Sequence, residues 1–140
     1  MTPRRMRVLL VGATGVVGRC VLNSLQDNHD VISASLDPAQ GDHAVQLDLS
    51  DADALVTTLK NLGPLDAVIS AAGRARFGAL TDARPASLDA SVYGLGLQDK
   101  LMGQVNLALA AREVLRPGGS ITLTSGTTST EPVLGGAGLS

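Results

Sequence analysis

The stretch VLLVGATGVVG, residues 8–18, decides the fold of this 140-residue chain. Its first four residues are apolar and run up to a glycine, which is typical of a parallel strand buried on both faces. From Val16 to Leu25 apolar residues recur at helical spacing, so the glycine-rich turn leads directly into a helix. A strand, such a turn and a helix in immediate succession indicate a dinucleotide-binding α/β domain.

Each glycine of this turn has its own expected role. Gly12 allows the tight turn, Gly15 lets the backbone approach a pyrophosphate, and Gly18 permits close packing of the helix on the strand. The start of the helix adds unpaired N–H groups and a partial positive charge, which favour phosphate. The predicted cofactor-binding residues of the turn are Gly12, Ala13, Thr14, Gly15, Val16, Val17 and Gly18.

Strands and helices alternate along the rest of the chain. Further strands are predicted at 30–35, 44–47, 66–69 and 120–124, and further helices from Ser50 or Asp51 to Leu62 and from 97 to 115. The helix that ends at Leu62 is expected to turn Leu55, Val56 and Leu59 inward. Residues 74–90 read as an irregular connection or short helical turns. This order predicts a parallel sheet with strand order 3-2-1-4-5 and helices on its faces.

Composition and charge exclude several classes of protein. The chain is 44% hydrophobic and 17% charged, which fits one globular domain. A net charge of -2 with scattered basic residues argues against nucleic-acid binding. Cys20 is the only cysteine, so an internal disulfide is excluded and a reducing, cytoplasmic location is expected. No apolar stretch is long enough for a membrane span, and His29 and His43 have no third ligand at metal spacing.

Three further motifs carry a family resemblance. The glycine spacing together with Asp48-Leu49-Ser50-Asp51, Ser70-Ala71-Ala72-Gly73 and Gly119-Ser120-Ile121 resembles the short-chain dehydrogenase/reductase family from about residue 7 to residue 125. The resemblance implies a Rossmann-type three-layer sandwich that binds NAD or NADP. In that family the first Asp of a motif like Asp48-Leu49 lies beside the adenine ring, and a motif like residues 70–73 shapes the floor under the cofactor. The cofactor residues that the resemblance adds are Asp48, Leu49, Ser70, Ala71, Ala72 and Gly73.

The choice between NAD and NADP depends on the end of the strand at 30–35. Here Ser35 occupies the family's usual acidic position and Leu36 its usual basic position, with Asp37 one residue later. Asp37 could accept a hydrogen bond from the ribose 2'-hydroxyl and favour NAD, or it could be a turn aspartate before a proline. Arg19 or Arg74 could instead supply charge to a 2'-phosphate. Leu36 and Asp37 are therefore predicted cofactor residues, and the preference stays open.

The catalytic set that the resemblance implies is a Ser, a Tyr, a Lys four residues later and an Asn. Gly126 falls at the Ser position with Ser125 beside it, Lys100 falls at the Asn position, and the Tyr would fall near Leu139. Ser125 and Lys100 are the remaining candidates for catalysis, and Lys100 is also a candidate cofactor contact. Tyr93 and Lys100 would share a helix face only if the helix began early, and the glycines between them argue against that.

The sequence is similar to short, divergent members of the family that lack the catalytic Tyr. We expect an NAD(P)-dependent oxidoreductase that acts on an unidentified small carbonyl or alcohol, with a nicotinamide dinucleotide as its cofactor. The alternatives are a non-catalytic NAD(P)-binding sensor or scaffold, and a truncated reductase without the C-terminal part of the usual fold. Residues 1–126 are expected to form the NAD(P)-binding domain and residues 127–140 a loop or frayed tail. The family commonly pairs its long helix, here 97–115, with that of another subunit, so a homo-oligomer is expected.

Overall fold

The fold is a five-stranded parallel sheet in the order β3-β2-β1-β4-β5, seen in a computed structural model that describes residues 4–38 and 44–136. The order and the parallel direction confirm the prediction. The elements in chain order are β1 (Arg7–Val11), α1 (Val16–Leu25), β2 (Asp30–Ser35), β3 (Ala44–Gln46), α2 (Ala52–Leu62), β4 (Leu65–Ser70), the short helix η1 (Leu80–Asp82), the π-helix η2 (Gly96–Met102), α3 (Gly103–Ala111) and β5 (Leu115–Thr122).

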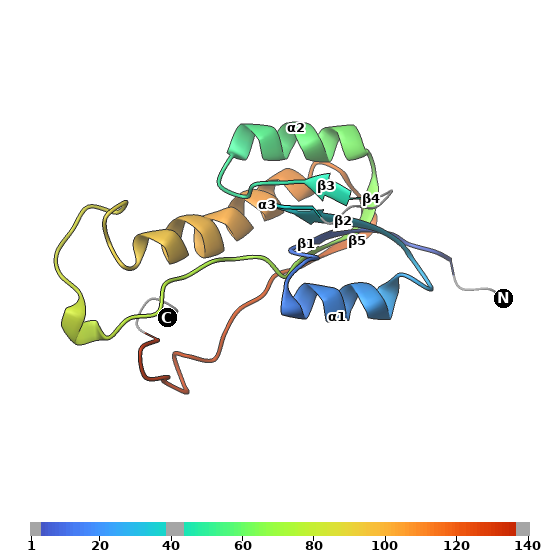
Figure 1. Cartoon of the computed structure of the whole chain (residues 1–140). Helices are drawn as coiled ribbons and strands as arrows, with labels where there is room; N and C mark the ends of the chain where they lie inside the picture. The colour runs from blue at the N-terminus through green and yellow to red at the C-terminus, as the bar shows by residue number, and fades with distance from the viewer. Residues whose placement is uncertain (1–3, 39–43, 137–140) are drawn as a thin grey trace.

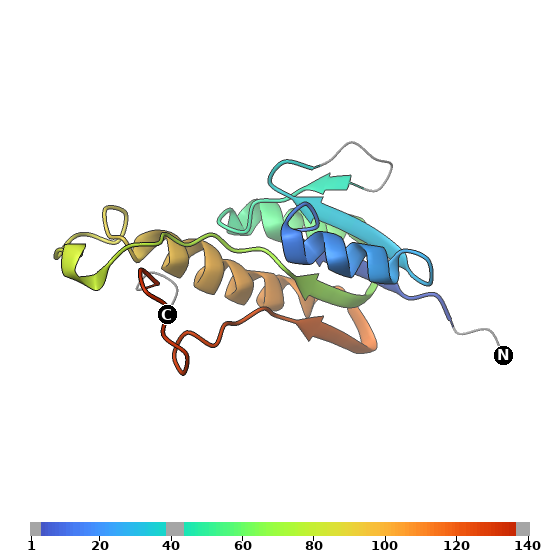
Figure 2. The same cartoon turned by 60° about the horizontal axis from the view of Figure 1, so that its bottom comes forward.

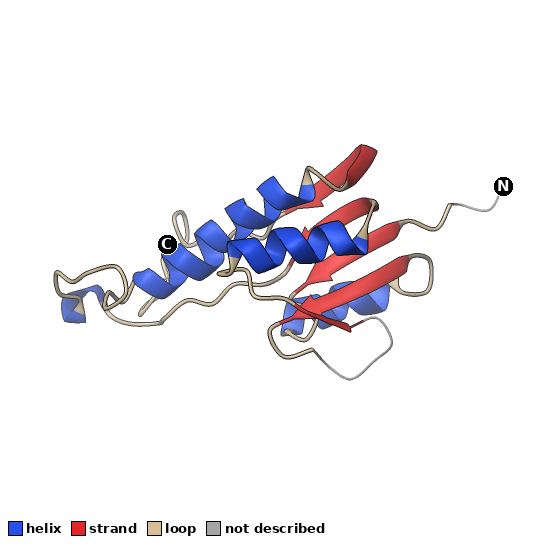
Figure 3. Ribbon diagram, turned by 90° about the horizontal axis from the view of Figure 1, so that it is seen from above, coloured by secondary structure: helices blue, strands red, loops and turns tan. Residues whose placement is uncertain are grey.

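Helices cover both faces of the sheet. Figure 1 shows α2 and α3 on one face and α1 on the other, and Figure 3 shows α2 and α3 side by side above the strands. The core lies between the central strands and the two-helix layer, and includes Leu9, Val68, Leu55, Leu59 and Leu107. This three-layer arrangement confirms the predicted Rossmann-type class.

The local signals of α2 explain where it begins and which face it buries. Asp51, rather than Ser50, is its N-cap, and the Asp51 carboxylate accepts a hydrogen bond from the backbone N–H of Ala54 at 3.0 Å. Leu55 and Leu59 are buried as predicted. Val56 is 39% exposed, contrary to the prediction, because the residue after Leu55 lies about 100° further around a helix.

The helix predicted from 97 to 115 differs in both its form and its end. It opens as the π-helix η2 and continues as α3, which ends at Ala111. Val114 lies in the turn that follows, and half-buried it packs against the core. The helix ends early because Leu115 already pairs with Leu65 of β4, so the chain must reach the sheet by that residue.

The segment Pro117-Gly118-Gly119 lies inside β5. The pairing of β5 with β4 shifts register between Leu65 and Ala67, and Gly118 has a φ of +79°. A proline and a left-handed glycine are tolerated here because β5 is the edge strand of the described sheet. The strand predicted at 120–124 therefore starts at Leu115 and ends at Thr122.

Two loop segments leave the sheet at the same end. Residues 71–95 follow β4 and residues 123–136 follow β5, and Figure 2 shows both running away from the carboxyl ends of the strands. The first is irregular apart from short turns and η1, as predicted. Gly78 bridges to Gly136 and holds the two segments together. Leu139, His43 and the last residues of the predicted tail lie outside the described residues.

None of the described helices is long and apolar enough to cross a membrane. Within residues 4–38 and 44–136, no three or more His, Cys, Asp or Glu side chains gather as a metal site would require.

Candidate cofactor site

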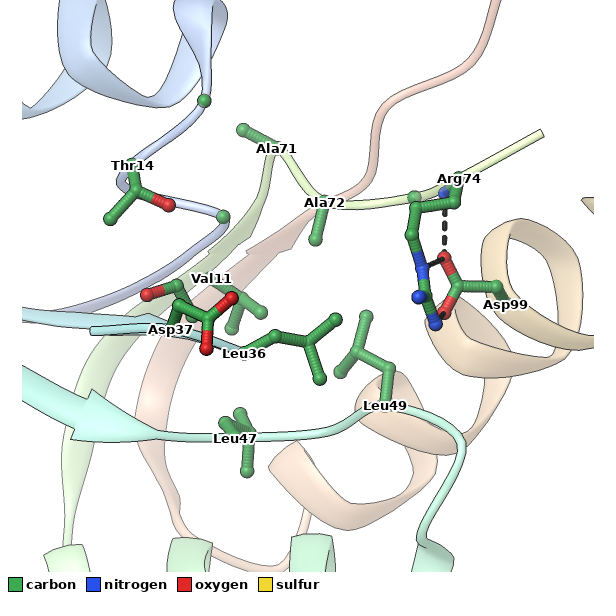
Figure 4. Close-up of a pocket in the computed structure, with 14 residues that line it drawn as sticks. Val11, Thr14, Leu36, Asp37, Leu47, Leu49, Ala71, Ala72, Arg74 and Asp99 are labelled. Atoms are coloured by element: carbon green, nitrogen blue, oxygen red, sulfur yellow. Dashed lines mark hydrogen bonds and ion pairs between the residues drawn. The ribbon is translucent and has the colours of Figure 1, made fainter. Parts of the chain in front are cut away.

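A cavity of about 280 Å³ opens at the carboxyl ends of β1, β2 and β4. We refer to it as the glycine-turn cavity, and Figure 4 shows its lining. The lining residues are Val11, Gly12, Thr14, Gly15, Ser35, Leu36, Asp37, Leu47, Leu49, Ala71, Ala72, Gly73, Arg74 and Asp99. The fold thus brings together three predicted segments: the glycine turn, the end of β2 and the residues after β4.

Gly12 and Gly18 are glycines because the backbone is crowded around them. Gly12 has a φ of +84°, and a Cβ there would lie 2.7 Å from the backbone C of Ala71 and N of Ala72. A Cβ on Gly18 would lie 1.9 Å from the carbonyl oxygen of Gly12. Gly18 therefore packs α1 against the turn itself, and both glycines are required by the fold.

Gly15 is different, because the fold does not need a glycine there. Its φ of -73° and ψ of 171° suit any residue, and a Cβ would meet only the Gly12 carbonyl oxygen, at 3.4 Å. Gly15 is the N-cap of α1; no side chain caps this helix, and its first turn holds no acidic residue. The first-turn residues Val16 and Val17 are exposed. The start of α1 therefore combines space with uncapped amides, which is what an anion needs.

The cavity continues into an apolar chamber beyond the end of β2. Leu36, Leu47 and Leu49 form one side, with Ala72 facing them in Figure 4. Asp37 lies at the exposed rim, one residue beyond Leu36. A narrow apolar space with a carboxylate at its rim can hold a planar base and a ribose hydroxyl.

Asp48 does not line this cavity. Its carboxylate accepts hydrogen bonds from the backbone N–H of Ser50 at 2.8 Å and from the Ser50 hydroxyl at 2.7 Å. These bonds hold the pKa of Asp48 below its ordinary value, and the charge of Arg74 acts in the same direction. Leu49, the next residue of the predicted motif, is the one that faces the cavity.

Arg74 and Asp99 close the far wall of the chamber. Asp99 accepts from the Arg74 backbone N–H at 2.6 Å, from Nε at 3.2 Å and from Nη2 at 3.2 Å. The pKa of Arg74 is raised above its ordinary value, first by the hydrogen bond to Asp99 and then by the charge of that carboxylate. Arg74 was predicted only as a possible phosphate ligand, and Asp99 was not predicted as a site residue. The one sign of this role in the sequence was an acidic residue in a predicted helix that is largely apolar. The structure shows that this residue, Asp99, is buried.

Lys100 and Ser125, the two catalytic candidates, line a second cavity of about 250 Å³. Lys100 also lies against the cofactor floor, because a Cβ on Gly73 would be 2.9 Å from Lys100 Cγ. Tyr93 precedes the helix, and its carbonyl oxygen accepts a hydrogen bond from the N–H of Leu97. Arg19 is exposed on α1 and is not part of the glycine-turn cavity lining.

Hydrogen bonds tie the second cavity to the cofactor floor. The Gln104 side chain accepts from the Thr124 N–H at 2.9 Å and donates to the Thr124 carbonyl at 2.9 Å. The Thr124 hydroxyl donates to the backbone carbonyl of Ser70. The Ser70 hydroxyl is buried, and no hydrogen-bond partner for it is found among the described residues. The floor is thus tied to the second cavity through the backbone of Ser70 and not through its side chain.

Comparisons with known proteins agree with this geometry. The chain is 34% identical to the protein lin1944 from Listeria innocua, with a TM-score of 0.81, covering 96% of this chain and 62% of that one. It is 26% identical to a small-chain dehydrogenase solved in complex with NADPH, with a TM-score of 0.76, covering 95% and 56% of the two chains. A short-chain dehydrogenase/reductase from Serratia marcescens, 18% identical over 99% of this chain and 66% of its own, shares the fold with a TM-score of 0.76.

The chain thus spans about three fifths of the length of these solved structures. No curated protein matches the sequence. The model of the NAD dependent epimerase/dehydratase family matches residues 8–122, which include all strands and helices of the described fold except Arg7, the first residue of β1. The chain belongs to the NAD dependent epimerase/dehydratase family and has the fold of the short-chain dehydrogenases/reductases.

Proposed function

We propose that the chain binds NAD in the glycine-turn cavity and is the cofactor-binding part of an oxidoreductase acting on a small carbonyl or alcohol. The observation that carries the proposal is Gly15. It is a glycine that the fold does not require, at the uncapped start of a helix, opening onto a cavity. A nicotinamide dinucleotide, when bound, supplies or accepts the hydride.

The cavity residues fit the parts of such a cofactor. The amides at the start of α1 suit the pyrophosphate, because they are uncapped donors at the positive end of a helix. The chamber at Leu36 and Leu49 suits the adenine ring, and Asp37 suits a ribose hydroxyl. The small-chain dehydrogenase that was solved with NADPH supports a dinucleotide of this type.

The charges favour NAD over NADP. Asp37 stands at the rim where a 2'-phosphate would lie, and the described residues beside it, 35–38, hold no Lys or Arg. Arg74 lines the cavity, but Asp99 accepts hydrogen bonds from it and the carboxylate of Asp48 is close enough to act on its pKa. A 2'-phosphate would therefore enter a region of excess negative charge.

Lys100 and Ser125 are the chain's own groups for the reaction. Lys100 and Ser125 line one cavity, so the ammonium of the one and the hydroxyl of the other are the donors available to a carbonyl oxygen placed there. With a dinucleotide bound to reduce that carbonyl, Lys100 would donate the proton that the carbonyl oxygen takes up. Lys100 then recovers a proton from solvent.

A second candidate function is binding without turnover, as in a sensor. Tyr93 is the only tyrosine of the given sequence, and the residue four positions after it is Leu97 rather than a lysine. The given sequence therefore holds no Tyr with a Lys four residues later. Saturable binding of the dinucleotide without turnover of any carbonyl or alcohol would favour this function.

The experiment is a calorimetric titration of the purified chain with NADH and NADPH, beside the variant Gly15→Asp. Aspartate is favoured at a helix N-cap, so the variant should keep its melting temperature. Its carboxylate occupies the phosphate site, and we expect a loss of affinity of about a hundredfold. Equal binding by both proteins would place the dinucleotide elsewhere, and no binding by the unaltered chain would refute the proposal.

We also propose that a second copy of the chain covers the outer face of η2 and α3. Leu97, Leu101, Val105 and Leu109 are all exposed and are spaced four residues apart, so they form one apolar stripe along this helix. Exposed apolar stripes of this kind mark interfaces. A second copy is the fitting occupant, because the stripe is apolar and uncharged along its length and two of them can pair across a two-fold axis.

A further inference from the structure

We infer that Arg74 is an adenine-binding residue, whose guanidinium plane stacks on the purine of the bound dinucleotide, and that Asp99 is the residue that positions it. The inference concerns the glycine-turn cavity and therefore rests on the proposed function. It assigns the far wall of that cavity, about which the glycine turn and the end of β2 say nothing.

The ion pair between Arg74 and Asp99 has a bidentate geometry. Arg74 Nε and Nη2 donate to the two oxygens of Asp99, each at 3.2 Å. This side-on fork aligns the guanidinium with the carboxylate. The 2.6 Å bond from the Arg74 backbone N–H to Asp99 fixes the main chain at the same point. Both the start and the end of the arginine side chain are thus held by one carboxylate.

The two partners of the ion pair are unequally buried. Asp99 is only 7% exposed, whereas the Arg74 side chain keeps 56% of its surface exposed. A buried carboxylate needs its hydrogen bonds, so Asp99 has a fixed place in the fold. The guanidinium is held by its edge and leaves surface available to the cavity that it lines.

The local backbone around Asp99 is a π-helix. Asp99 lies in η2 rather than in the regular helix α3. Segments of π-helix occur mostly as short insertions, and they are frequent at functional sites. Asp99 lies in the wall of the glycine-turn cavity, and the next residue, Lys100, lines the second cavity.

The chemistry of the chamber suits an aromatic ring. The chamber is lined by Leu36, Leu49 and Ala72, and Arg74 is the one cation among the described residues of the lining. An apolar space with a guanidinium in its wall can hold such a ring, since arginine stacks on aromatic faces. A phosphate is a poorer partner, because the charge of Arg74 is already offset by Asp99 and by nearby Asp48.

The test separates the two halves of the cofactor. Dissociation constants of NADH, ADP-ribose and reduced nicotinamide mononucleotide would be measured for the unaltered chain, Arg74→Ala and Arg74→Lys. Removal of the guanidinium should weaken NADH and ADP-ribose alike, by about fivefold to tenfold, and leave the mononucleotide unchanged. Lysine keeps the charge but not the plane, so Arg74→Lys should recover less than half of the loss in free energy.

Two further variants complete the design. Arg76→Ala removes an exposed arginine two residues away, is not part of the cavity lining, and should leave all three ligands unchanged. Asp99→Asn keeps the shape of the positioning residue and removes its charge. It should weaken NADH and ADP-ribose by about twofold to threefold without moving the mononucleotide, provided that its melting curve stays cooperative.

The outcomes are distinct. Equal weakening of all three ligands by Arg74→Ala would mean that Arg74 supports the whole site, and would overturn the inference. NADPH is titrated beside these three ligands, and a loss of affinity confined to NADPH would make Arg74 a phosphate ligand, which also overturns the inference. If the dissociation constant of NADH is the same for Arg74→Ala as for the unaltered chain, the inference is refuted and the proposed function stands. Failure of the unaltered chain to bind NADH refutes both.

Discussion

Charged and polar groups have different roles at the two ends of the parallel sheet. At the amino ends of the strands, Asp66 of β4 accepts hydrogen bonds from Arg4 at 2.7 Å, the Arg7 backbone at 2.8 Å and Arg116 at 2.8 Å. At the carboxyl ends the strands open onto two cavities, and the start of α1 is uncapped. Paired charge at one end joins strands, whereas available donors beside empty space at the other end are suited to a ligand.

The same contrast separates two glycines that lie three residues apart. Gly18 is surrounded by backbone and is needed to close the turn, whereas the Cβ position of Gly15 is not crowded. A Cβ on Gly15 would make one ordinary contact, at 3.4 Å from the Gly12 carbonyl oxygen, so the fold requires the glycine at 18 and not the one at 15. Substitutions at these positions give the strongest test of the contrast.

The largest expected effect is the destabilisation of the fold by Gly18→Ala. The new methyl group would lie 1.9 Å from the Gly12 carbonyl oxygen, so α1 must move away from the turn. We expect a loss of at least about 3 kcal/mol in the free energy of unfolding, at the upper end for overpacking. Urea denaturation measures it, with Gly15→Asp as the matched control that stays within about 1 kcal/mol of the unaltered chain. Equal stability of the two variants would contradict the distinction between the glycines.

The next effect concerns the apolar stripe, which runs along η2 and α3 and reaches the second cavity at Leu101. Leu101→Glu places a charge at its centre, and we expect self-association to weaken by about 2 kcal/mol or more, roughly thirtyfold in the dissociation constant. Sedimentation velocity over a range of concentrations measures this. Leu134→Glu is the control, because Leu134 is fully exposed and lies away from the helix. If the unaltered chain sediments only as a monomer, the proposal that a second copy covers the stripe is refuted.

The third effect tests the carboxylate at the rim of the glycine-turn cavity. Asp37→Ser removes the charge that opposes a 2'-phosphate, so the ratio of NADH to NADPH affinity should fall by about tenfold, or about 1.4 kcal/mol. Calorimetry with both dinucleotides gives the ratio. Asp27→Ser makes the same charge change in an exposed turn before β2, at the amino end of the sheet. If the two variants change the ratio equally, Asp37 acts only through the net charge of the chain.

The sequence predicted the elements whose signals are local. The bounds of α1 and β2 follow from apolar spacing and from the glycines and turns beside them, and the structure has the same bounds. The end of the helix predicted at 97–115 was wrong because it is set by a partner 50 residues away, when Leu115 pairs with Leu65. No local pattern in the sequence carries that pairing.

The candidate site divides in the same way. Its glycine turn could be predicted because one short stretch contains the strand, the turn and the helix. The pair of Arg74 and Asp99 was not predicted, since its members are 25 residues apart and meet only once η2 packs beside the segment after β4. The meeting of Lys100 and Ser125 in one cavity likewise depends on β5 lying next to β4.

The smallest effect belongs to the paired end of the sheet and appears only in acid. The Arg7 backbone bond, followed by Arg116 and Arg4, holds the pKa of Asp66 below its ordinary value of 3.8. A depressed folded-state pKa means that this stabilisation is complete above pH 3.8 and is lost as the pH falls through the folded value. Urea midpoints from about pH 5 to about pH 2.5 should therefore fall more steeply for the unaltered chain than for Asp66→Asn, which has no proton to take up there. Asp27→Asn should follow the unaltered chain. If instead the curves of Asp66→Asn and the unaltered chain run parallel, the Asp66 cluster does not join the strands electrostatically, and the contrast between the two ends of the sheet loses its structural half.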